Sequence, residues 1–149
     1  MKVVIIGGVA GVAYGSAHAT QDLDICAVLT PASIQRLREA LKDLHPKHRM
    51  TSQKLSFLEI PKDNDPPVHN LYLNTDLGTI DILSDVIGVG DYERLKSKAV
   101  SIPLGNKTCL LMGLEDLIKT KETLGREKDL APLRELRAIA DARAKTPQK

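Results

Sequence analysis

The segment that most constrains the fold lies near the start of the chain, at residues 3–25, and reads VVIIGGVAGVAYGSAHATQDLDI. It opens with an apolar, β-branched run from Val3 to Ile6, which is followed by Gly7 and Gly8. Such a run closed by glycines predicts a buried strand that enters a tight turn. A segment of small residues and a polar turn then lead to a second predicted strand.

This second strand carries acidic residues that alternate with apolar ones, in the order Asp-Leu-Asp-Ile. Side chains two positions apart on a strand share a face, so Asp22 and Asp24 should point the same way and Leu23 and Ile25 toward the core. The same alternation returns around Asp81, in the sequence TIDIL. If the two strands are neighbours, three carboxylates meet at one place.

Three clustered carboxylates repel one another and raise each other's pKa unless a cation neutralises them. Mg²⁺ fits this role, because proteins usually hold it with a few carboxylates together with the phosphates of a substrate. The glycine turn suits the same chemistry, since a backbone without Cβ atoms can approach a polyphosphate and the N–H groups at a helix start favour an anion. The two features together indicate a nucleotide site.

The pattern resembles the nucleotidyltransferases of the DNA polymerase β superfamily in their minimal form. Their signature is a strand, a Gly-Gly or Gly-Ser turn, a helix, a strand with Asp-x-Asp, and a third aspartate on a later strand. The matching positions in this sequence are Gly7, Gly8, Asp22, Asp24 and Asp81.

A bacterial subgroup of this superfamily, which includes relatives of the toxin and antitoxin type, has the most similar sequence around the two aspartates. Its pattern is His-Gly or Tyr-Gly followed by Arg-x-Thr-x-Asp-x-Asp, and Tyr14, Gly15 and Thr20 match it. His18 stands where that subgroup usually has arginine, so no substrate contact of the arginine is carried over. The segments LEDLIKTK and REKDL further along also resemble the family, which extends the resemblance from residue 3 to about residue 136.

The resemblance implies Mg²⁺-dependent transfer of a nucleoside monophosphate from an NTP to an acceptor hydroxyl, with release of pyrophosphate. Asp22 and Asp24 would bridge two Mg²⁺ ions, with Mn²⁺ as an alternative metal. Asp81 would complete the metal ligands and help to deprotonate the attacking hydroxyl. Asp76 and Asp85 compete with Asp81 for the third position, but a turn and a strand end are less suited to face the site.

The resemblance also suggests how the phosphates would be bound. Gly7 and Gly8 would hold them through backbone groups, helped by Ser16 or Lys121. Lys121 falls on the apolar stripe of a predicted helix, where it could equally extend its ammonium group to solvent along the apolar surface. His18 is better explained as a residue of the polar turn.

The composition is that of one globular domain spanning residues 1–149, with 42% hydrophobic and 27% charged residues and no repeat, linker or membrane-spanning segment. The fold class that we expect is α/β (α+β), with a mixed sheet of about four to six strands and helices mainly on one face. Aromatic residues make up only 3%, which argues against a single-strand-binding module built on aromatic stacking. The net charge of +2 is too small to indicate nucleic-acid binding by itself.

The two cysteines, Cys26 and Cys109, lie in apolar contexts and fit neither a zinc site nor a disulfide framework. We expect both to be reduced and buried, in a cytoplasmic protein with no membrane partner. Lys2 and the apolar run, followed by the small residues around Ser16, also imitate a signal peptide. The absence of a secreted cysteine pattern makes this the weaker interpretation.

The remaining elements follow from periodicity and turn residues. Thr30 and Pro31 should cap and start a helix, and Asp129 should cap the last helix, with Pro132 in its first turn. Helices are also expected near 91–97 and from 114, a strand at 55–60, a loop at 61–67 and a frayed tail at 142–149. A hairpin is expected at 71–83, and residues 101–111 should form another hairpin or a final strand.

Two other functions share the same fold. One is a nucleotide sensor or an antitoxin-like partner protein without turnover, acting with a partner protein or as a homodimer. The other is a toxin-type enzyme that modifies tRNA or protein. The acceptor can therefore be tRNA or another RNA, a protein or a small molecule.

Overall fold

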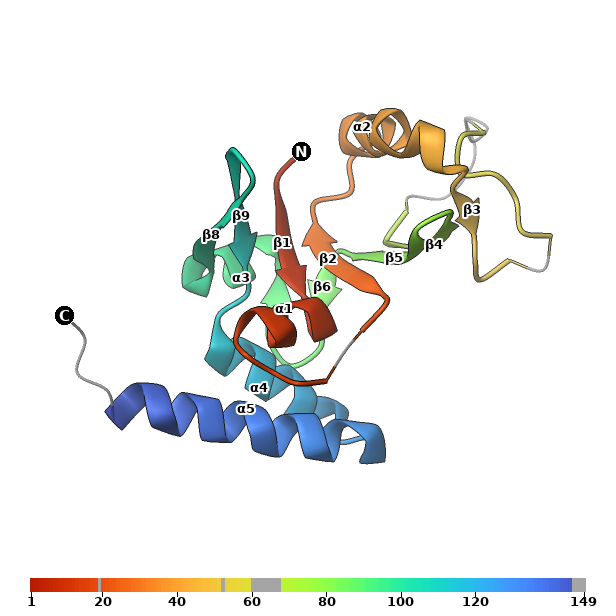
Figure 1. The fold of residues 1–149 in the computed structure, drawn as a ribbon. Helices are drawn as coiled ribbons and strands as arrows, with labels where there is room; N and C mark the ends of the chain where they lie inside the picture. The colour runs from red at the N-terminus through yellow and green to blue at the C-terminus, as the bar shows by residue number, and fades with distance from the viewer. Residues whose placement is uncertain (19, 52, 60–67, 146–149) are drawn as a thin grey trace.

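The computed structural model describes residues 1–149 except 19, 52, 60–67 and 146–149. Its centre is a mixed seven-stranded sheet in the order β3-β4-β5-β2-β1-β9-β8 (Figure 1). The strands are β1 (Val3–Ile6), β2 (Leu23–Ala27), β3 (Lys47–His48), β4 (Asn70–Thr75), β5 (Gly78–Leu83), β8 (Val100–Leu104) and β9 (Lys107–Leu111). A separate pair joins β6 (Asp85–Val86) to β7 (Gly90–Asp91). The expected four to six strands were one too few, because β3 is a two-residue strand with no hydrophobic pattern of its own.

The register of the central strands confirms the neighbours that the aspartate pattern required. β1 runs antiparallel to β2 and parallel to β9, whereas β2 runs parallel to β5. The hairpin predicted at 71–83 is present as β4 with β5, and residues 100–111 form the hairpin β8 with β9, which was one of the two alternatives for this segment. The first strand is confirmed with its predicted bounds, Val3–Ile6.

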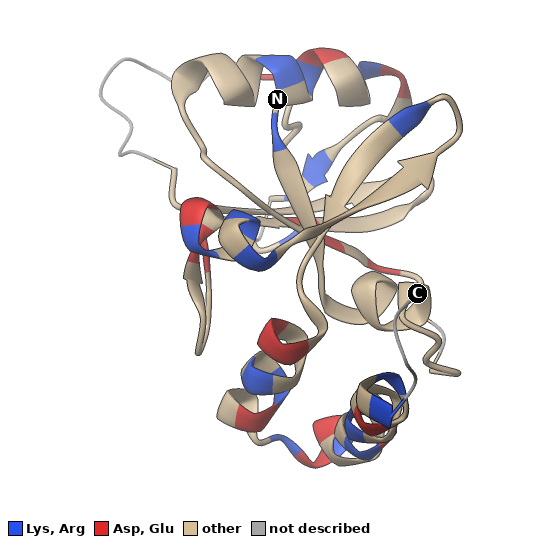
Figure 2. Ribbon diagram, turned by 90° about the vertical axis from the view of Figure 1, so that its left-hand side faces the viewer, with Lys and Arg blue, Asp and Glu red and all other residues tan. Residues whose placement is uncertain are grey.

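Helices cover both faces of the sheet, and in the part of the chain that the structure describes four of them lie on one face and one on the other. One hydrophobic core packs α1 (Gly7–Ala13), α3 (Tyr92–Lys98), α4 (Leu114–Leu124) and α5 (Glu127–Lys145) on residues such as Val4, Ile6 and Cys26. The other packs α2 (Pro31–Leu41) on Ile25, Ala27 and Ile82. This arrangement confirms the mixed sheet with helices mainly on one face. Figure 2 shows that most charged residues lie on the helices, while the strands are largely uncharged.

The start of α2 follows the predicted cap. Oγ1 of Thr30 accepts from the backbone N–H of Ser33 at 3.1 Å, and the backbone N–H of Thr30 donates to Oγ of Ser33 at 2.8 Å. Pro31 is the first helical residue, where its missing N–H costs no hydrogen bond. The helix continues as a short 3-10 turn, Lys42–Leu44, before the chain turns at His45.

The strand predicted at 55–60 is wrong for the residues that the structure describes. Ser56 makes a single bridge to Lys47, and the residues after it form turns. Phe57 is only 1% exposed and packs in the core under α2, with the guanidinium of Arg38 5.3 Å from its ring centre. The apolar residues here anchor a loop through one large side chain and do not extend the sheet. Residue 60 and the predicted loop at 61–67 lie outside the described residues.

Three expectations for the C-terminal region are corrected. Gly125, with φ +58°, ends α4, and α5 begins two residues later at Glu127, so Asp129 lies inside its first turn and is not the N-cap. Pro132 is consequently inside the helix and not in its first turn. The helix also continues through residues 142–145, where we expected a frayed end. Arg143 lies over the ring of Tyr14, 5.0 Å from its centre, which attaches this end of the helix to the domain.

Cys26 is buried, as predicted, but Cys109 is only half-buried; both thiols are free. In the described part of the chain, no helix is long and apolar enough to cross a membrane.

Candidate active site

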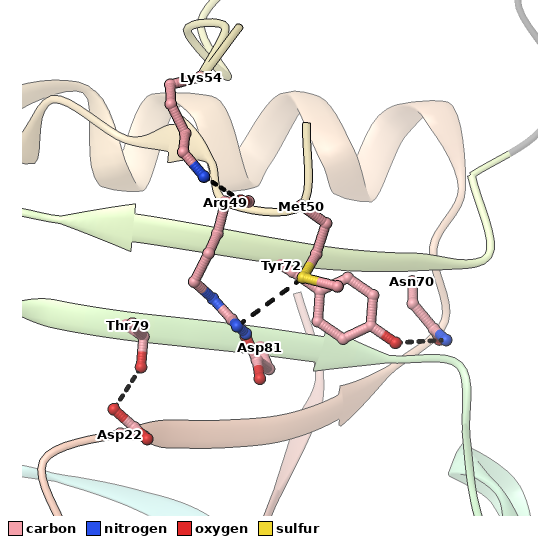
Figure 3. A network of polar contacts seen from close by, with 8 residues as sticks. All are labelled: Asp22, Arg49, Met50, Lys54, Asn70, Tyr72, Thr79 and Asp81. Atoms are coloured by element: carbon pink, nitrogen blue, oxygen red, sulfur yellow. Dashed lines mark hydrogen bonds and ion pairs between the residues drawn. The ribbon is translucent and has the colours of Figure 1, made fainter. Parts of the chain in front are cut away.

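The predicted carboxylates meet at one end of the central strands. Asp24 on β2 is the direct partner of Asp81 on the parallel strand β5. Asp22 comes immediately before β2, and its side chain lies beside the start of β5, where it accepts a hydrogen bond from the hydroxyl of Thr79 (Figure 3). The structure thus places the three predicted aspartates, Asp22, Asp24 and Asp81, near one another. The competing aspartates lie against histidines instead, Asp76 at 2.6 Å from His45 and Asp85 at 3.5 Å from His69.

Asp81 has a partner that the sequence did not reveal. Nη2 of Arg49 lies 2.5 Å from Oδ1 of Asp81, and its guanidinium stands 5.6 Å from the ring centre of Tyr72 (Figure 3). Tyr72 is the β4 residue directly opposite Asp81. Arg49 follows β3 in a basic, polar segment without any recognisable motif, so only the strand order could have placed it here.

The pKa of Asp24 is raised above its ordinary value. Burial is the largest cause, followed by the negative charges of Asp81 and Asp22, while Arg49 and Lys121 act in the opposite direction. The ionised form of Asp24 is therefore disfavoured by burial and by carboxylate repulsion, which Arg49 and Lys121 do not fully offset. Such a carboxylate is suited to bind a cation.

The donor set fits a hard divalent cation in chemistry, because all three side chains offer carboxylate oxygens. It is not assembled as a metal site in this structure: among the described residues, no three acidic, histidine or cysteine side chains are grouped closely enough to hold an ion. Asp22 is engaged by Thr79 and Asp81 by Arg49, which leaves Asp24 as the carboxylate with a charge deficit.

The glycines at the end of β1 lie against this carboxylate cluster. Gly7 has φ +65°, and a Cβ there would be 2.5 Å from Oδ2 of Asp24. A Cβ on Gly8 would be 3.0 Å from the Thr20 side chain. The predicted turn is not a separate segment, because β1 ends at Ile6 and α1 begins at Gly7 itself. A side chain at Gly7 would thus displace Asp24, whether or not a phosphate binds nearby.

Ser16 and His18 lie in a loop that is attached to α5. The Ser16 hydroxyl donates to Oε1 of Glu135, the backbone N–H of Ala17 donates to Oε2 at 3.1 Å, and Nδ1 of His18 is 3.1 Å from Oε1. These hydrogen bonds, led by that of Ser16, lower the pKa of Glu135 to about 2. His18 therefore helps to fix the loop that leads into β2.

Lys121 points inward, and its side chain is 15% exposed. Its Nζ lies 3.6 Å from Asp129, which also binds Arg126 through two contacts of 2.6 and 3.1 Å. Hydrogen bonding to Arg126 is the main reason why the pKa of Asp129 is lowered. Lys121 also contributes positive potential at Asp24, so its charge acts on the carboxylate site. Contact with a phosphate stays a prediction.

Comparison with known proteins places the fold in a known class. The sequence matches no family model and no curated protein. A crystal structure from Thermotoga maritima, provisionally named a nucleotidyltransferase, superposes with a TM-score of 0.54 over 90% of this chain and 80% of that chain, at 16% sequence identity. The chain therefore has a nucleotidyltransferase-like fold. At this identity the likeness concerns the fold alone.

Proposed function

We propose that the protein is a Mg²⁺-dependent nucleotidyltransferase that moves a nucleoside monophosphate from an NTP to an acceptor hydroxyl. The observation that carries this proposal is the register of Asp24 beside Asp81, at the end of the sheet where Gly7 contacts Asp24. Asp24 is a carboxylate that the protein's own cations do not fully neutralise, and it lies next to glycine backbone without Cβ atoms. This combination suits a metal-bound triphosphate.

In this proposal Asp22 and Asp24 hold two Mg²⁺ ions, or Mn²⁺ in their place, and Asp81 completes the ligands. The bound metal supplies positive charge to the attacking and leaving oxygens. Asp81 accepts the proton of the acceptor hydroxyl, whose oxygen forms a bond to the α-phosphorus. The bond from the α-phosphorus to the bridging oxygen breaks, and pyrophosphate leaves with that electron pair.

The triphosphate would lie along Gly7 and Gly8, within the positive potential of Lys121. Lys121 can approach it only by moving from Asp129, at 3.6 Å, which is a long and weak pair. Ser16 would first have to release Glu135. We therefore rank Lys121 above Ser16 as a phosphate ligand.

The acceptor would be tRNA or another RNA, a protein or a small molecule. A cytoplasmic location, and assembly with a partner protein or as a homodimer, belong to the same proposal. The two free cysteines support the location, and the sequence pattern of the toxin and antitoxin subgroup supports the assembly.

A second candidate is a nucleotide sensor or antitoxin-like protein without turnover. One observation favours it: Asp22 and Asp81 are both engaged within the protein, by Thr79 and Arg49. Three retained carboxylates favour the enzyme, because a protein that only binds has no chemical need for all of them.

The deciding experiment incubates the protein with each of the four NTPs, labelled at the α-phosphate, together with Mg²⁺ and total RNA, protein or small-molecule extract. The Asp22→Asn variant is the control. Label in one fraction, and only with the intact aspartate, would establish the reaction and the acceptor class. No label in any fraction, with an NTP still raising the melting temperature, would favour the sensor.

A further inference from the structure

The Asp81 carboxylate is neutralised by a cation of the protein itself. Nη2 of Arg49 lies 2.5 Å from Oδ1 of Asp81, and the two side chains are 31% and 22% exposed. The pair is therefore partly shielded from solvent, where a charge-assisted hydrogen bond is stronger than on an open surface. An oxygen held in this way is not free to coordinate a metal.

The backbone of Arg49 is fixed while its side chain has a route to solvent. Its N–H donates to the carbonyl of Tyr72 at 2.8 Å, and its own carbonyl accepts from Nζ of Lys54 at 2.6 Å. Nη1 faces the sulfur of Met50 at 3.9 Å, and Met50 is 69% exposed. Rotation of the side chain alone can thus separate Arg49 from Asp81 without unfolding the segment.

The guanidinium is also incompletely bonded where it lies. Its Nε is buried and has no hydrogen-bond partner within the described part of the chain. An unpaired buried donor costs free energy, which lowers the cost of moving the group away. Arg49 is therefore held chiefly by its charge pair with Asp81 and by its position over Tyr72.

We infer that Arg49 competes with divalent cations for Asp81, so that the free protein binds them through Asp22 and Asp24 alone and gains Asp81 as a ligand only when Arg49 leaves. This inference rests on the proposed function, because it assigns the three aspartates to a metal site. It adds a positioning residue that sets how many carboxylates a cation meets.

The test measures Mn²⁺ binding to the full chain without nucleotide, by titration calorimetry and by the electron paramagnetic resonance signal of free Mn²⁺. Arg49→Met removes the charge and keeps an unbranched side chain over Tyr72. Arg36→Met, at an exposed position of α2, is the matched control for the change in net charge. Arg49→Lys restores a cation.

We expect Arg49→Met to tighten Mn²⁺ binding by about tenfold, the scale of a pair worth roughly 1.4 kcal/mol. Arg36→Met and Arg49→Lys should stay near the wild type. Equal affinities in Arg49→Met and Arg36→Met would overturn the inference. Circular dichroism establishes first that each variant is folded.

A charge-balanced double variant, Arg49→Met with Asp81→Asn, keeps the test decisive if the single variant folds poorly. It should bind Mn²⁺ as the wild type does, because Asp81 is not a ligand in the free wild-type protein. Clearly weaker binding would mean that Asp81 already ligates the ion, which contradicts the inference. Asp24→Asn distinguishes a failure of the proposed function from a failure of this inference. If the variant retains full Mn²⁺ affinity, the metal site of the proposed function is wrong, independently of the results for Arg49.

Discussion

Asp24 and Asp129 are both shielded carboxylates, yet the protein shifts their pKa values in opposite directions. Asp129, 3% exposed, has Arg126 and Lys121 as partners, and its pKa is lowered. Asp24 faces two other carboxylates, and its pKa is raised. Burial raises both pKa values and is the largest cause at Asp24, where two carboxylates add to it, whereas at Asp129 hydrogen bonding to Arg126 outweighs burial. A shielded acid whose cations outweigh the effect of burial serves the fold, whereas one whose nearby cations do not is available to a ligand.

The largest effect should come from neutralising Asp24. Asp24→Asn removes a ligand of the proposed metal site, so we expect nucleotidyl transfer to fall about 10³-fold or more. Its melting temperature should not fall, because the substitution relieves carboxylate repulsion. Label-transfer rates and thermal unfolding of the same preparation check both statements. If activity were lost only because the variant unfolds, Asp24 would be a structural acid like Asp129, and the proposed contrast between them would be wrong.

The matching substitution in the other region should have the reverse result. Asp129→Asn removes the carboxylate that pairs with Lys121, whose side chain is only 15% exposed. We expect the free energy of unfolding to fall by about 2 kcal/mol, which corresponds to roughly 4–8 °C in melting temperature. This value is already reduced because Arg126, the other partner, is partly exposed. Chemical denaturation measures it. An unchanged midpoint would show that the cluster around Asp129 is not structural.

Two glycines offer a matched pair near the site and away from it. Gly7 and Gly105 have similar φ values, +65° and +64°, but a Cβ on Gly7 meets Asp24, whereas a Cβ on Gly105 meets nothing within 4 Å. Gly105→Ala should cost about 1 kcal/mol from backbone strain alone, and Gly7→Ala about 2 kcal/mol. Only Gly7→Ala should also reduce transfer. Equal costs and full activity in both would show that Asp24 moves aside freely.

The opposite pKa shifts predict opposite pH dependences, measured without divalent cations. Asp24 binds its proton more tightly in the folded state, so its contribution to stability is lost as pH rises from 3.8 through its raised pKa. Asp129 contributes stability above 3.8 that is lost as pH falls through its lowered pKa. The free energy of unfolding of the wild type minus that of Asp24→Asn, measured at each pH, isolates the contribution of Asp24. A difference that grew with rising pH would contradict the sign.

The smallest effect is expected for His18. Glu135 keeps its bonds to Ser16 and Ala17 when the imidazole is removed. His18→Ala should therefore change stability by less than about 0.5 kcal/mol and leave transfer almost unchanged. A large loss of transfer would give His18 the role of the arginine found in the similar subgroup.

Local sequence signals predicted the elements that short-range chemistry determines. The Thr30 cap, the hairpin of β4 with β5 and the first strand belong to this group, because turn residues and alternation fix them within a few positions. The pairing of Asp24 with Asp81 was predictable as well, since each strand displayed its aspartate between apolar neighbours.

The failures involve contacts between distant segments. Phe57 leaves the predicted strand because the core under α2 accepts it, which no local pattern records. Arg49 reaches Asp81 only through the order β3-β4-β5, and β3 is two residues long. Asp129 is not the N-cap because α5 begins at Glu127, and its side chain pairs with Lys121 of α4, a contact that local spacing does not record. The carboxylates of the candidate site and the inward position of Lys121 were thus predictable, while Arg49 was not.

The attachment of the Ser16 loop to Glu135 has a consequence for the order of events during synthesis. The two residues are separated by 119 positions, so at 5–20 residues per second roughly 6–24 s pass between their additions to the chain. Until Glu135 has emerged, the loop ahead of Asp22 lacks its anchor. The nascent chain therefore carries the glycine turn and both early aspartates well before it can hold them in place, and the site is completed only when α5 docks.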